Sequence, residues 1–515
     1  MRSGKSFVAR IALAFALVGL ALVPAASADH PVADSSLLEE LADSASFLSV
    51  GVQQNPAFQD PPIHGVPTNH NGKGQRHSLN FRKLDREPII DRRNELRAEG
   101  TDLAFRNRLM VAGSYEGTGF FRMNKSRTNV EQISFHSCPG SQGDVSIMGD
   151  YVFVSIDSPS SNEEKTPTCN NTRTNGRRLN ESPSSLEAEG IRILDISNLQ
   201  NPRQVGFVET ECGSHTHTII PKGRGKAFLY VDSYPIANVP VLEECSELSH
   251  DEGEFSVVKF DSDRPGRARV VSTPDVIKSP QTDAIGCHDT GVLLRKNKPD
   301  LAACSGLGRW VLLNVERPAD PKVYSMVNNA RIELDHSAAF SWDGKVAVIG
   351  DEHAGAAGGG GCSTNSQSPV GAMWFYDIRN PRNPILRGHH SLPRVPIPDS
   401  AEESERFRCT THNYNILPTK DRDRYLAAVP YYMGGVAVVN FSNPSKPREA
   451  GFFLPEVRGT LPDMWSGYWY NGKIFTNEHA SQLGVSIFER AGTGSRTVRF
   501  FSGAMNPQTQ KGPFK

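Results

Sequence analysis

The chain has no long apolar run beyond its first residues, no strong excess of either charge and no clustering of basic with aromatic residues. After residue 23 no segment approaches the roughly 18 apolar residues that a membrane helix needs, so no membrane span is expected. The 56 Lys and Arg residues nearly balance the 57 Asp and Glu residues, giving a formal net charge of -1. This balance provides no field that would attract nucleic acid or an anionic membrane.

Several catalytic and cofactor motifs are also missing. There is no C-x-x-C pair, which argues against a thiolate metal site. The glycine run AGAAGGGG at residues 354–361 lacks the G-K-[S/T] ending and the strand-to-helix setting of a phosphate loop, and we interpret it as a loop. No G-x-S-x-G nucleophile elbow occurs.

The first 28 residues have the features of a secretory signal peptide. Arg2, Lys5 and Arg10 form a basic region, residues 11–23 are apolar, and residues 26–28 read Ala-Ser-Ala, a small-residue cleavage site. The mature chain is therefore expected to begin near Asp29 and to be secreted by a Sec-type route.

Residues 29–104 differ in composition from the rest of the chain. Residues 35–50 could form one amphipathic helix, residues 53–77 are rich in Pro, Asn and Gly, and residues 82–100 are dense in charges of both signs. We expect this part to be an N-terminal arm, partly helical or disordered, that packs against or wraps the larger C-terminal domain.

Residues 409–457 show the repeating unit of that domain. Apolar runs at 414–417, 425–429 and 436–441 are too short for helices, are rich in β-branched and aromatic residues, and are separated by polar or glycine-containing turns. They predict antiparallel strands a, b and c. Prolines at 444 and 447 end strand c and redirect the chain into a fourth strand.

The same order recurs along the chain. Strand c and its proline-bearing turn reappear at residues 191–206, 255–268, 310–324 and 374–388. Six units begin near His136, His215, His288, His336, His412 and Trp465, and a partial unit lies upstream at residues 109–123. Repeats of roughly 40–50 residues with four short strands each are typical of a β-propeller. The sequence predicts an all-β fold, a seven-bladed β-propeller of four-stranded antiparallel blades, over residues 105–515.

These units resemble the LVIVD-repeat family of secreted bacterial β-propeller proteins. The matches are IRILDISNLQNP at residues 191–202, MWFYDIRNPRNP at 373–384 and VAVVNFSNPSKP at 436–447, and residues 469–489 look like a last blade of such proteins. The resemblance covers about residues 105–490. It implies a propeller scaffold and no shared activity.

The eight cysteines predict a disulfide framework in an exported chain. They are Cys138, Cys169, Cys212, Cys245, Cys287, Cys304, Cys362 and Cys409. Four precede strand a and four follow strand b, and these positions meet at one face because a and b are antiparallel. Nearest-neighbour pairing gives 138–169, 212–245, 287–304 and 362–409, and we prefer it. A second scheme gives 169–212, 245–287, 362–409 and 138–304.

Histidines recur at the expected mouth of the central channel. Five units place them at the start of strand a, the innermost strand: His136, His215 with His217, His288, His336 and His412. Two more follow strand b, in the pairs Glu352-His353 and Glu478-His479. Convergent neutral imidazoles with a nearby carboxylate suit Cu, Zn, Fe or Mn. The alternative is a purely structural set of histidines, each hydrogen-bonded within its own blade.

Two functions therefore stay open. In the first, the protein is an exported binding or interaction module whose His-rich, disulfide-stapled face recognises a small molecule or a cell-envelope partner. In the second, it is a metal-dependent enzyme, such as an oxidoreductase acting on a small molecule at the channel mouth, with Glu352 or Glu478 as acid or base. We favour the first, because no nucleophile or cofactor motif stands out from the repeat pattern.

Overall fold

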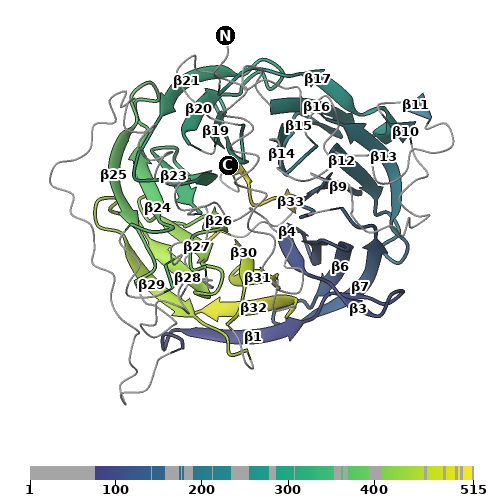
Figure 1. The fold of residues 1–515 in the computed structure, drawn as a ribbon, viewed down its shortest axis with the longest axis horizontal. Helices are drawn as coiled ribbons and strands as arrows, with labels where there is room; N and C mark the ends of the chain where they lie inside the picture. Colours follow the sequence, from purple (N-terminus) through teal and green to yellow (C-terminus); the bar gives the residue numbers. More distant parts are fainter. Residues whose placement is uncertain are drawn as a thin grey trace, which may run out of the picture.

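The computed structural model describes residues 76–512 except 141, 157–172, 175–176, 179–189, 211–212, 234–254, 278–285, 307, 353–360, 363–368, 394–407, 458–460, 480–482, 493–496 and 499–502. The described residues form β-strands and one short 3-10 helix, η2 (Pro265–Arg267), and contain no α-helix. The sheets are arranged in a ring around a central axis, which is the architecture of a β-propeller (Figure 1). The all-β prediction is confirmed.

Each sheet of the first half of the ring is ordered from the axis outward, and its four main strands are antiparallel to their neighbours. The first contains β4 (Gly100–Arg106), β5 (Leu109–Ser114), β6 (Gly117–Met123) and β7 (Val130–Ser137). The second contains β8 (Val145–Met148), β9 (Tyr151–Ile156), β12 (Gly190–Asp195) and β13 (Arg203–Glu209), extended by β10 (Arg173–Thr174) and β11 (Arg177–Arg178). The third contains β14 (Thr216–Pro221), β15 (Lys226–Asp232), β16 (Phe255–Asp261) and β17 (Arg269–Ser272).

The second half continues in the same way. One sheet contains β18 (Asp289–Leu294), β19 (Leu301–Ser305), β20 (Trp310–Asn314) and β21 (Lys322–Val327). The next contains β22 (Asp335–Phe340), β23 (Val346–Asp351), β24 (Met373–Asp377) and β25 (Ile385–His390). An eight-stranded sheet joins β26 (Asn413–Ile416), β27 (Leu426–Pro430), β28 (Val436–Asn440) and β29 (Arg448–Phe453) to β30 (Met464–Tyr470), β31 (Lys473–Glu478), β32 (Val485–Arg490) and β1 (Phe81–Glu87). A separate small hairpin pairs β2 (Ile90–Asp91) with β3 (Leu96–Arg97).

The repeated Asp/Asn-Pro motif ends the third strand of a sheet through two consecutive side-chain turns. After β12, Ser197 N donates to Asp195 Oδ1 at 2.9 Å and Gln200 N donates to Asn198 Oδ1 at 3.1 Å. Equivalent turns follow β24 and β28, with Asp377, Asn380, Asn440 and Asn443 as acceptors. Because these side chains satisfy the main chain in place of a ladder partner, the strand stops there and the chain turns back.

The tight Asp-Gly and Asn-Gly turns join inner strand pairs as expected. Gly344, between β22 and β23, has φ of 68°, while Asn471 and Gly472, between β30 and β31, have φ of 49° and 96°. Asn471 and Gly472 form a two-residue turn whose twist matches that of the flanking strands, whereas Gly344 lies in the five-residue connection of residues 341–345.

Apolar side chains on both faces of each sheet pack against the neighbouring sheets. The rings of Phe153 and Phe260 lie 4.8 Å apart between the second and third sheets, and those of Phe375 and Phe441 stack 4.9 Å apart between β24 and the end of β28. The core is therefore distributed around the ring rather than gathered at one centre. No helix of the length and hydrophobicity needed to span a membrane occurs in the described part of the chain.

Strands within residues 81–106 belong to the ring, which therefore extends beyond the domain boundary expected at residue 105. β1 is the outermost strand beside β32, and Phe81 packs at 6.2 Å from Phe488. β4, beginning at Gly100, is an innermost strand paired with β5. Closing the last sheet with an early strand removes two free edges. The helix expected at residues 35–50 lies outside the described residues.

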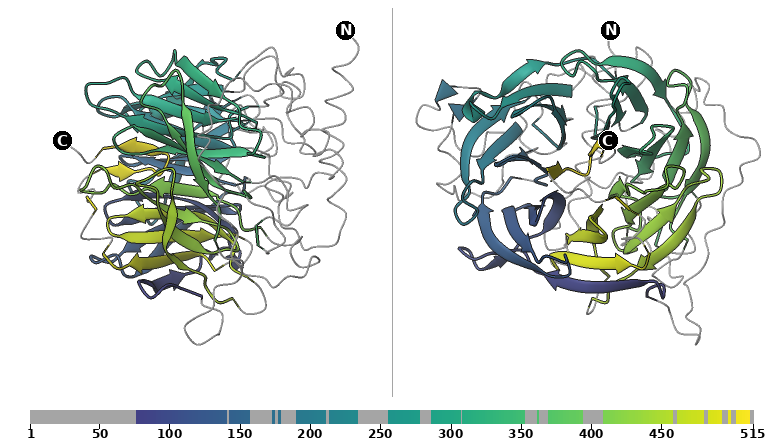
Figure 2. Two further views of the ribbon diagram at one scale, coloured as in Figure 1. Left: turned by 90° about the vertical axis from the view of Figure 1, so that its left-hand side faces the viewer. Right: turned by 180° about the vertical axis from the view of Figure 1, so that it is seen from behind.

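The C-terminal segment crosses the centre of the ring (Figure 1; Figure 2 shows the ring edge-on). β33 (Ala504–Met505) pairs with the end of β4, and β34 (Thr509–Lys511) pairs with the end of β18. Between them, the Asn506 side chain exchanges two hydrogen bonds with the main chain of Ile147. The side chain of Gln510, on β34, does the same with Phe340. The segment thus bonds to four innermost strands, β4, β8, β18 and β22. These contacts lie at the opposite ends of the strands from the histidines at their starts.

Two disulfides match the nearest-neighbour scheme. Cys287–Cys304 ties the start of β18 to β19, and Cys362–Cys409 ties the loop after β23 to the start of β26. The first bond excludes the second scheme, in which Cys287 and Cys304 have other partners. Cys138 is disulfide-bonded as well, while Cys169, Cys212 and Cys245 lie outside the described residues.

Removing the Cys287–Cys304 bond with the double substitution Cys287→Ala and Cys304→Ala should lower the free energy of unfolding by about 3 kcal/mol, the value for a closed loop of this size. The two cysteines are 17 residues apart. Urea unfolding of both proteins under oxidising conditions measures the difference, and equal midpoints would show that the bond does not constrain the unfolded chain.

Candidate metal centre

Four histidines from four successive sheets meet at the starts of the innermost strands. His215, His288 and His412 directly precede β14, β18 and β26, and His336 is the second residue of β22. Their ring centroids follow one another at 4.3 Å, 3.9 Å and 4.4 Å. All four are at most 2% exposed. The structure thus brings these four residues together around the axis of the ring, at the starts of the innermost strands where the repeat pattern had placed them.

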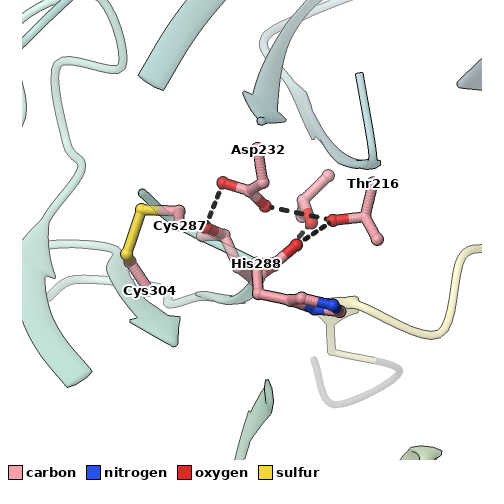
Figure 3. The surroundings of a disulfide bond; sticks show 7 residues. Thr216, Asp232, Cys287, His288 and Cys304 are labelled. Atoms are coloured by element: carbon pink, nitrogen blue, oxygen red, sulfur yellow. Dashed lines mark hydrogen bonds between the residues drawn. A yellow bond between two sulfur atoms is a disulfide. The ribbon is translucent and has the colours of Figure 1, made fainter. Parts of the chain in front are cut away.

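Main-chain hydrogen bonds to the second strand hold these histidines in place. His215 N donates to Asp232 O at 2.9 Å, and His288 N donates to Ser305 O at 2.6 Å. Figure 3 shows His288 between the adjoining Cys287–Cys304 disulfide and Thr216, whose hydroxyl donates to the main-chain oxygen of His288 at 2.6 Å. The antiparallel inner pair therefore sets the position of each imidazole.

A buried carboxylate faces this row of imidazoles. Glu352, just after β23 and 4% exposed, places Oε2 3.3 Å from His336 Nε2 and Oε1 3.7 Å from His412 Nε2. Tyr432 donates its hydroxyl hydrogen bond to the same Oε1. One potential ligand atom from each of His288, His336 and Glu352 lies within 4.8 Å of the others.

The tautomer of His412 is fixed by its other ring nitrogen. Nδ1 lies 2.6 Å from the main-chain oxygen of Trp465. A carbonyl oxygen only accepts, so Nδ1 carries a proton and donates it. In the neutral ring the Nε2 lone pair then points toward Glu352, and a cation between the two acceptors would be bound by both.

Asp289 lies behind the candidate ligands. Its Oδ2 is 3.7 Å from Nδ1 of both His288 and His336. Burial raises the pKa of Asp289 well above its usual value, and the neighbouring carboxylates of Asp144 and Asp232 raise it further. With a cation bound nearby, which would favour the ionised form of Asp289, its carboxylate would orient the imidazoles and increase their basicity.

Two imidazoles and one carboxylate are a donor set suited to iron, zinc, copper or manganese. Zinc bonds to such donors are about 2.0–2.2 Å long, so ligand atoms sit about 3–4 Å apart around one ion. The three ligand atoms lie within 4.8 Å of one another, so small side-chain rotations would bring all three within bonding distance of one ion. Three protein ligands leave positions for water or another ligand.

An aromatic wall with one guanidinium borders the group. The His412 ring lies 4.5 Å from Tyr432 and 4.7 Å from Trp465. Arg408 stacks 3.9 Å above the Tyr432 ring and pairs with Asp463 at 3.5 Å. Tyr432 was not predicted from the sequence; it lies two residues after β27, whereas Glu352 and His479 directly follow β23 and β31.

His136 is not at the channel mouth, which corrects the prediction. It lies on β7, the outermost strand of its sheet, opposite Thr118 of β6. The motif FHSC ends an outer strand instead of starting an inner one. Both positions lie at the same end of a sheet, so the sequence pattern alone did not separate them.

His217 is a structural residue two positions along from His215, on β14. Its Nε2 bonds Ser146 Oγ at 2.7 Å, its Nδ1 bonds Ser155 Oγ at 2.8 Å, and Asp144 Oδ2 lies 3.1 Å from Nδ1. Burial lowers the pKa of His217 to about 3. This network clamps the second sheet to the third, so His217 fits the structural alternative for the histidines.

The remaining candidates do not join the group or lie outside the described residues. His479 Nδ1 is 3.2 Å from Asp463 Oδ2, and its ring lies 5.0 Å from that of Trp465. Glu478 Oε2 accepts a hydrogen bond from Asp463 N at 2.8 Å. His353 lies outside the described residues.

Comparisons with known proteins do not identify a family for this chain. Models of protein families and curated proteins gave no match. Among solved structures, the chain is similar to the crystal structure of Saccharomyces cerevisiae Sqt1, at 8% identity and a TM-score of 0.44 over 83% of this chain and 90% of that one.

Replacing His217 with Asn should lower the free energy of unfolding by roughly 3 kcal/mol at pH 7.5, because three buried polar contacts are lost. The folded pKa of about 3 lies below the unfolded value near 6.5, so the contribution of the neutral ring is complete above pH 6.5 and declines as the pH falls toward 3. At pH 5 the loss should be about 2 kcal/mol smaller. Denaturant unfolding at both pH values measures this, with the exposed His77→Asn as control; an equal loss at both would contradict it.

Proposed function

We propose that the protein is an exported, seven-bladed β-propeller binding module that holds a divalent transition metal at the mouth of its channel. The proposal depends on the convergence of His288, His336 and Glu352, each buried, from two adjacent sheets. In this proposal His412 and Asp289 support the ligands, and the open coordination positions of the metal bind a small molecule or a group on a cell-envelope partner.

The architecture and the disulfides support the wider parts of this proposal. In the described part of the chain the sheets contain seven runs of four strands, counting two within the eight-stranded sheet. The Cys287–Cys304 and Cys362–Cys409 bonds are consistent with an oxidising compartment. The signal-peptide features of residues 1–28 and the LVIVD-type turns after β12, β24 and β28 support export and membership of that repeat family.

The second candidate is a metal-dependent enzyme, with an oxidoreductase as its most natural form. Two histidines and one carboxylate leave several positions open on an iron-like ion, a donor set that nature uses for oxygen chemistry. The wall of Tyr432, Trp465 and Arg408 beside the group would place a small substrate next to the metal. Glu352 is then a metal ligand rather than an acid or base.

Elemental analysis of the mature protein without a His tag tests the proposal. We expect about one equivalent of a transition metal per chain, falling to trace levels in Glu352→Gln because an amide oxygen is a much weaker ligand. Glu478→Gln is the matched control, since Glu478 is also buried and also lies at the end of the second strand of its sheet, as the last residue of β31 where Glu352 directly follows β23. Metal-free wild-type protein after supplementation, or equal metal in Glu352→Gln, would refute it.

A further inference from the structure

A buried arginine lies between the first two sheets, away from the histidine row. Arg192 is on β12, is 7% exposed, and donates from Nη1 to the main-chain oxygen of Cys138 at 3.0 Å. Among the residues that the structure describes, its Nε has no hydrogen-bond partner and no carboxylate pairs with it. Burial lowers the pKa of Arg192 to about 10, so it stays charged at neutral pH.

His136, which the metal group does not use, lies in the field of this arginine. It is 7% exposed, and its Nε2 is buried without a hydrogen-bond partner in the described part of the chain. Burial and the charges of Arg192 and Arg93 lower the pKa of His136 to about 3. The ring is therefore neutral and keeps one N–H that can donate.

Asp91, an acidic residue two positions from Arg93, is already engaged in other hydrogen bonds. Arg93 comes from the β2–β3 hairpin, and the Asp91 carboxylate there accepts from Arg93 N at 3.0 Å and from Asn94 Nδ2 at 2.8 Å. A buried charge without a counterion is strongly unfavourable unless something compensates for it. A guanidinium with an unpaired Nε–H, bonded to a main-chain oxygen two residues from a histidine, offers donors of the kind that bind oxyanions.

We propose that Arg192 and His136 form a binding site for a small oxyanion at the junction of β7 and β12, on the face that carries Cys138. The planar guanidinium would supply a two-pronged contact, and the neutral imidazole would donate a third hydrogen bond. These donors select a ligand with an anionic oxygen group, which free sulfate, free phosphate or the carboxylate of a larger ligand can supply. This site is independent of the metal centre.

Thermal unfolding of the metal-stripped mature protein tests the site. Sulfate, phosphate and acetate are each titrated at constant ionic strength, with chloride as the replaced salt. At least one of the three should raise the Tm saturably, and the preferred anion distinguishes a tetrahedral from a planar ligand. In Arg192→Met the anion-dependent rise should disappear, whereas the exposed Arg82→Met, whose side chain is 72% exposed, should respond like the wild type.

Arg192→Lys separates a binding role from a structural one. Lysine keeps the positive charge but lacks the planar guanidinium that contacts two oxygens at once. The protein should still fold, and its anion affinity measured by calorimetry should fall at least about tenfold. If Arg192→Met does not fold, Arg192→Lys and His136→Gln decide the question. The proposal is overturned if none of the three anions exceeds the effect of chloride, or if Arg192→Lys binds the preferred anion as tightly as the wild type.

Discussion

Replacing His336 with alanine is expected to lower the affinity of the protein for the proposed transition metal by at least about a hundredfold. Structural zinc sites contribute roughly 10–16 kcal/mol, so losing one of three ligands costs at least about 3 kcal/mol, which exceeds a hundredfold in Kd. His336 is the central member: its Nε2 is 3.3 Å from Glu352, and its ring is 3.9 Å from that of His288.

The measurement is competition with a chelator of known affinity, using metal-reconstituted protein without a tag. His390→Ala serves as the control. It removes another buried imidazole of the same sheet, on the outermost strand β25, where His390 bonds the Tyr431 hydroxyl at 3.0 Å. An unchanged Kd in His336→Ala, with folding intact, would place the metal elsewhere or leave the histidines with a structural role alone.

Truncating the chain after Gly503 is expected to lower the free energy of unfolding by roughly 5 kcal/mol. The deletion removes the paired side-chain amide bonds of Asn506 and Gln510, the bond from Thr509 Oγ1 to Ile219 O at 2.6 Å and the bond from Val292 N to Gln508 O at 2.8 Å. Six buried hydrogen bonds at about 1 kcal/mol each set the scale. The inner strands also lose the groups that satisfy their main chain.

Denaturant unfolding of the truncated protein measures the loss, and a chain ending at Lys511 is the matched control because it keeps β33 and β34 intact. The single substitution Gln510→Leu should reproduce about a third of the effect, since the side chain supplies two of the six bonds. If the truncated protein is as stable as the control, the C-terminal segment does not contribute to the free energy of unfolding.

The repeating pattern of the sequence was sufficient to locate the strands, because it reports local chemistry. The three apolar runs expected within residues 409–457 agree with β26, β27 and β28 to within one residue or so at most ends. Strands buried on both faces give short apolar runs, and the Asx turns that end them require specific residue types at fixed spacing.

The outer closing strand escaped prediction because little of its sequence is apolar. β1 reads FRKLDRE, and only Phe81 in it is fully buried. An edge strand at the rim of a ring needs charges toward solvent, so its pattern resembles that of a charged linker. His136 was misplaced for a related reason. The outermost strand of one sheet ends, and the innermost strand of the next begins, at the same face of the ring, so a histidine between them fits either position.

The details of the candidate site depend on contacts between sheets that sequence spacing does not reveal. Which imidazoles approach Glu352 depends on how neighbouring sheets pack. Tyr432 bonds Glu352 from a loop position at which its own φ is 46°. Likewise, Asn506 and Gln510 act through side-chain amides paired with distant main chain, which leaves no periodic signal in the sequence.

The location of a bound metal tests the proposed centre most directly. Crystals of the mature protein, reconstituted with one equivalent of zinc or iron, are measured at the absorption edge of that metal. One strong anomalous peak is expected within bonding distance of His288, His336 and Glu352, about 2.0–2.2 Å from the ligand atoms for zinc. A peak at another place, or no peak with these three side chains hydrogen-bonded only to one another, would contradict it.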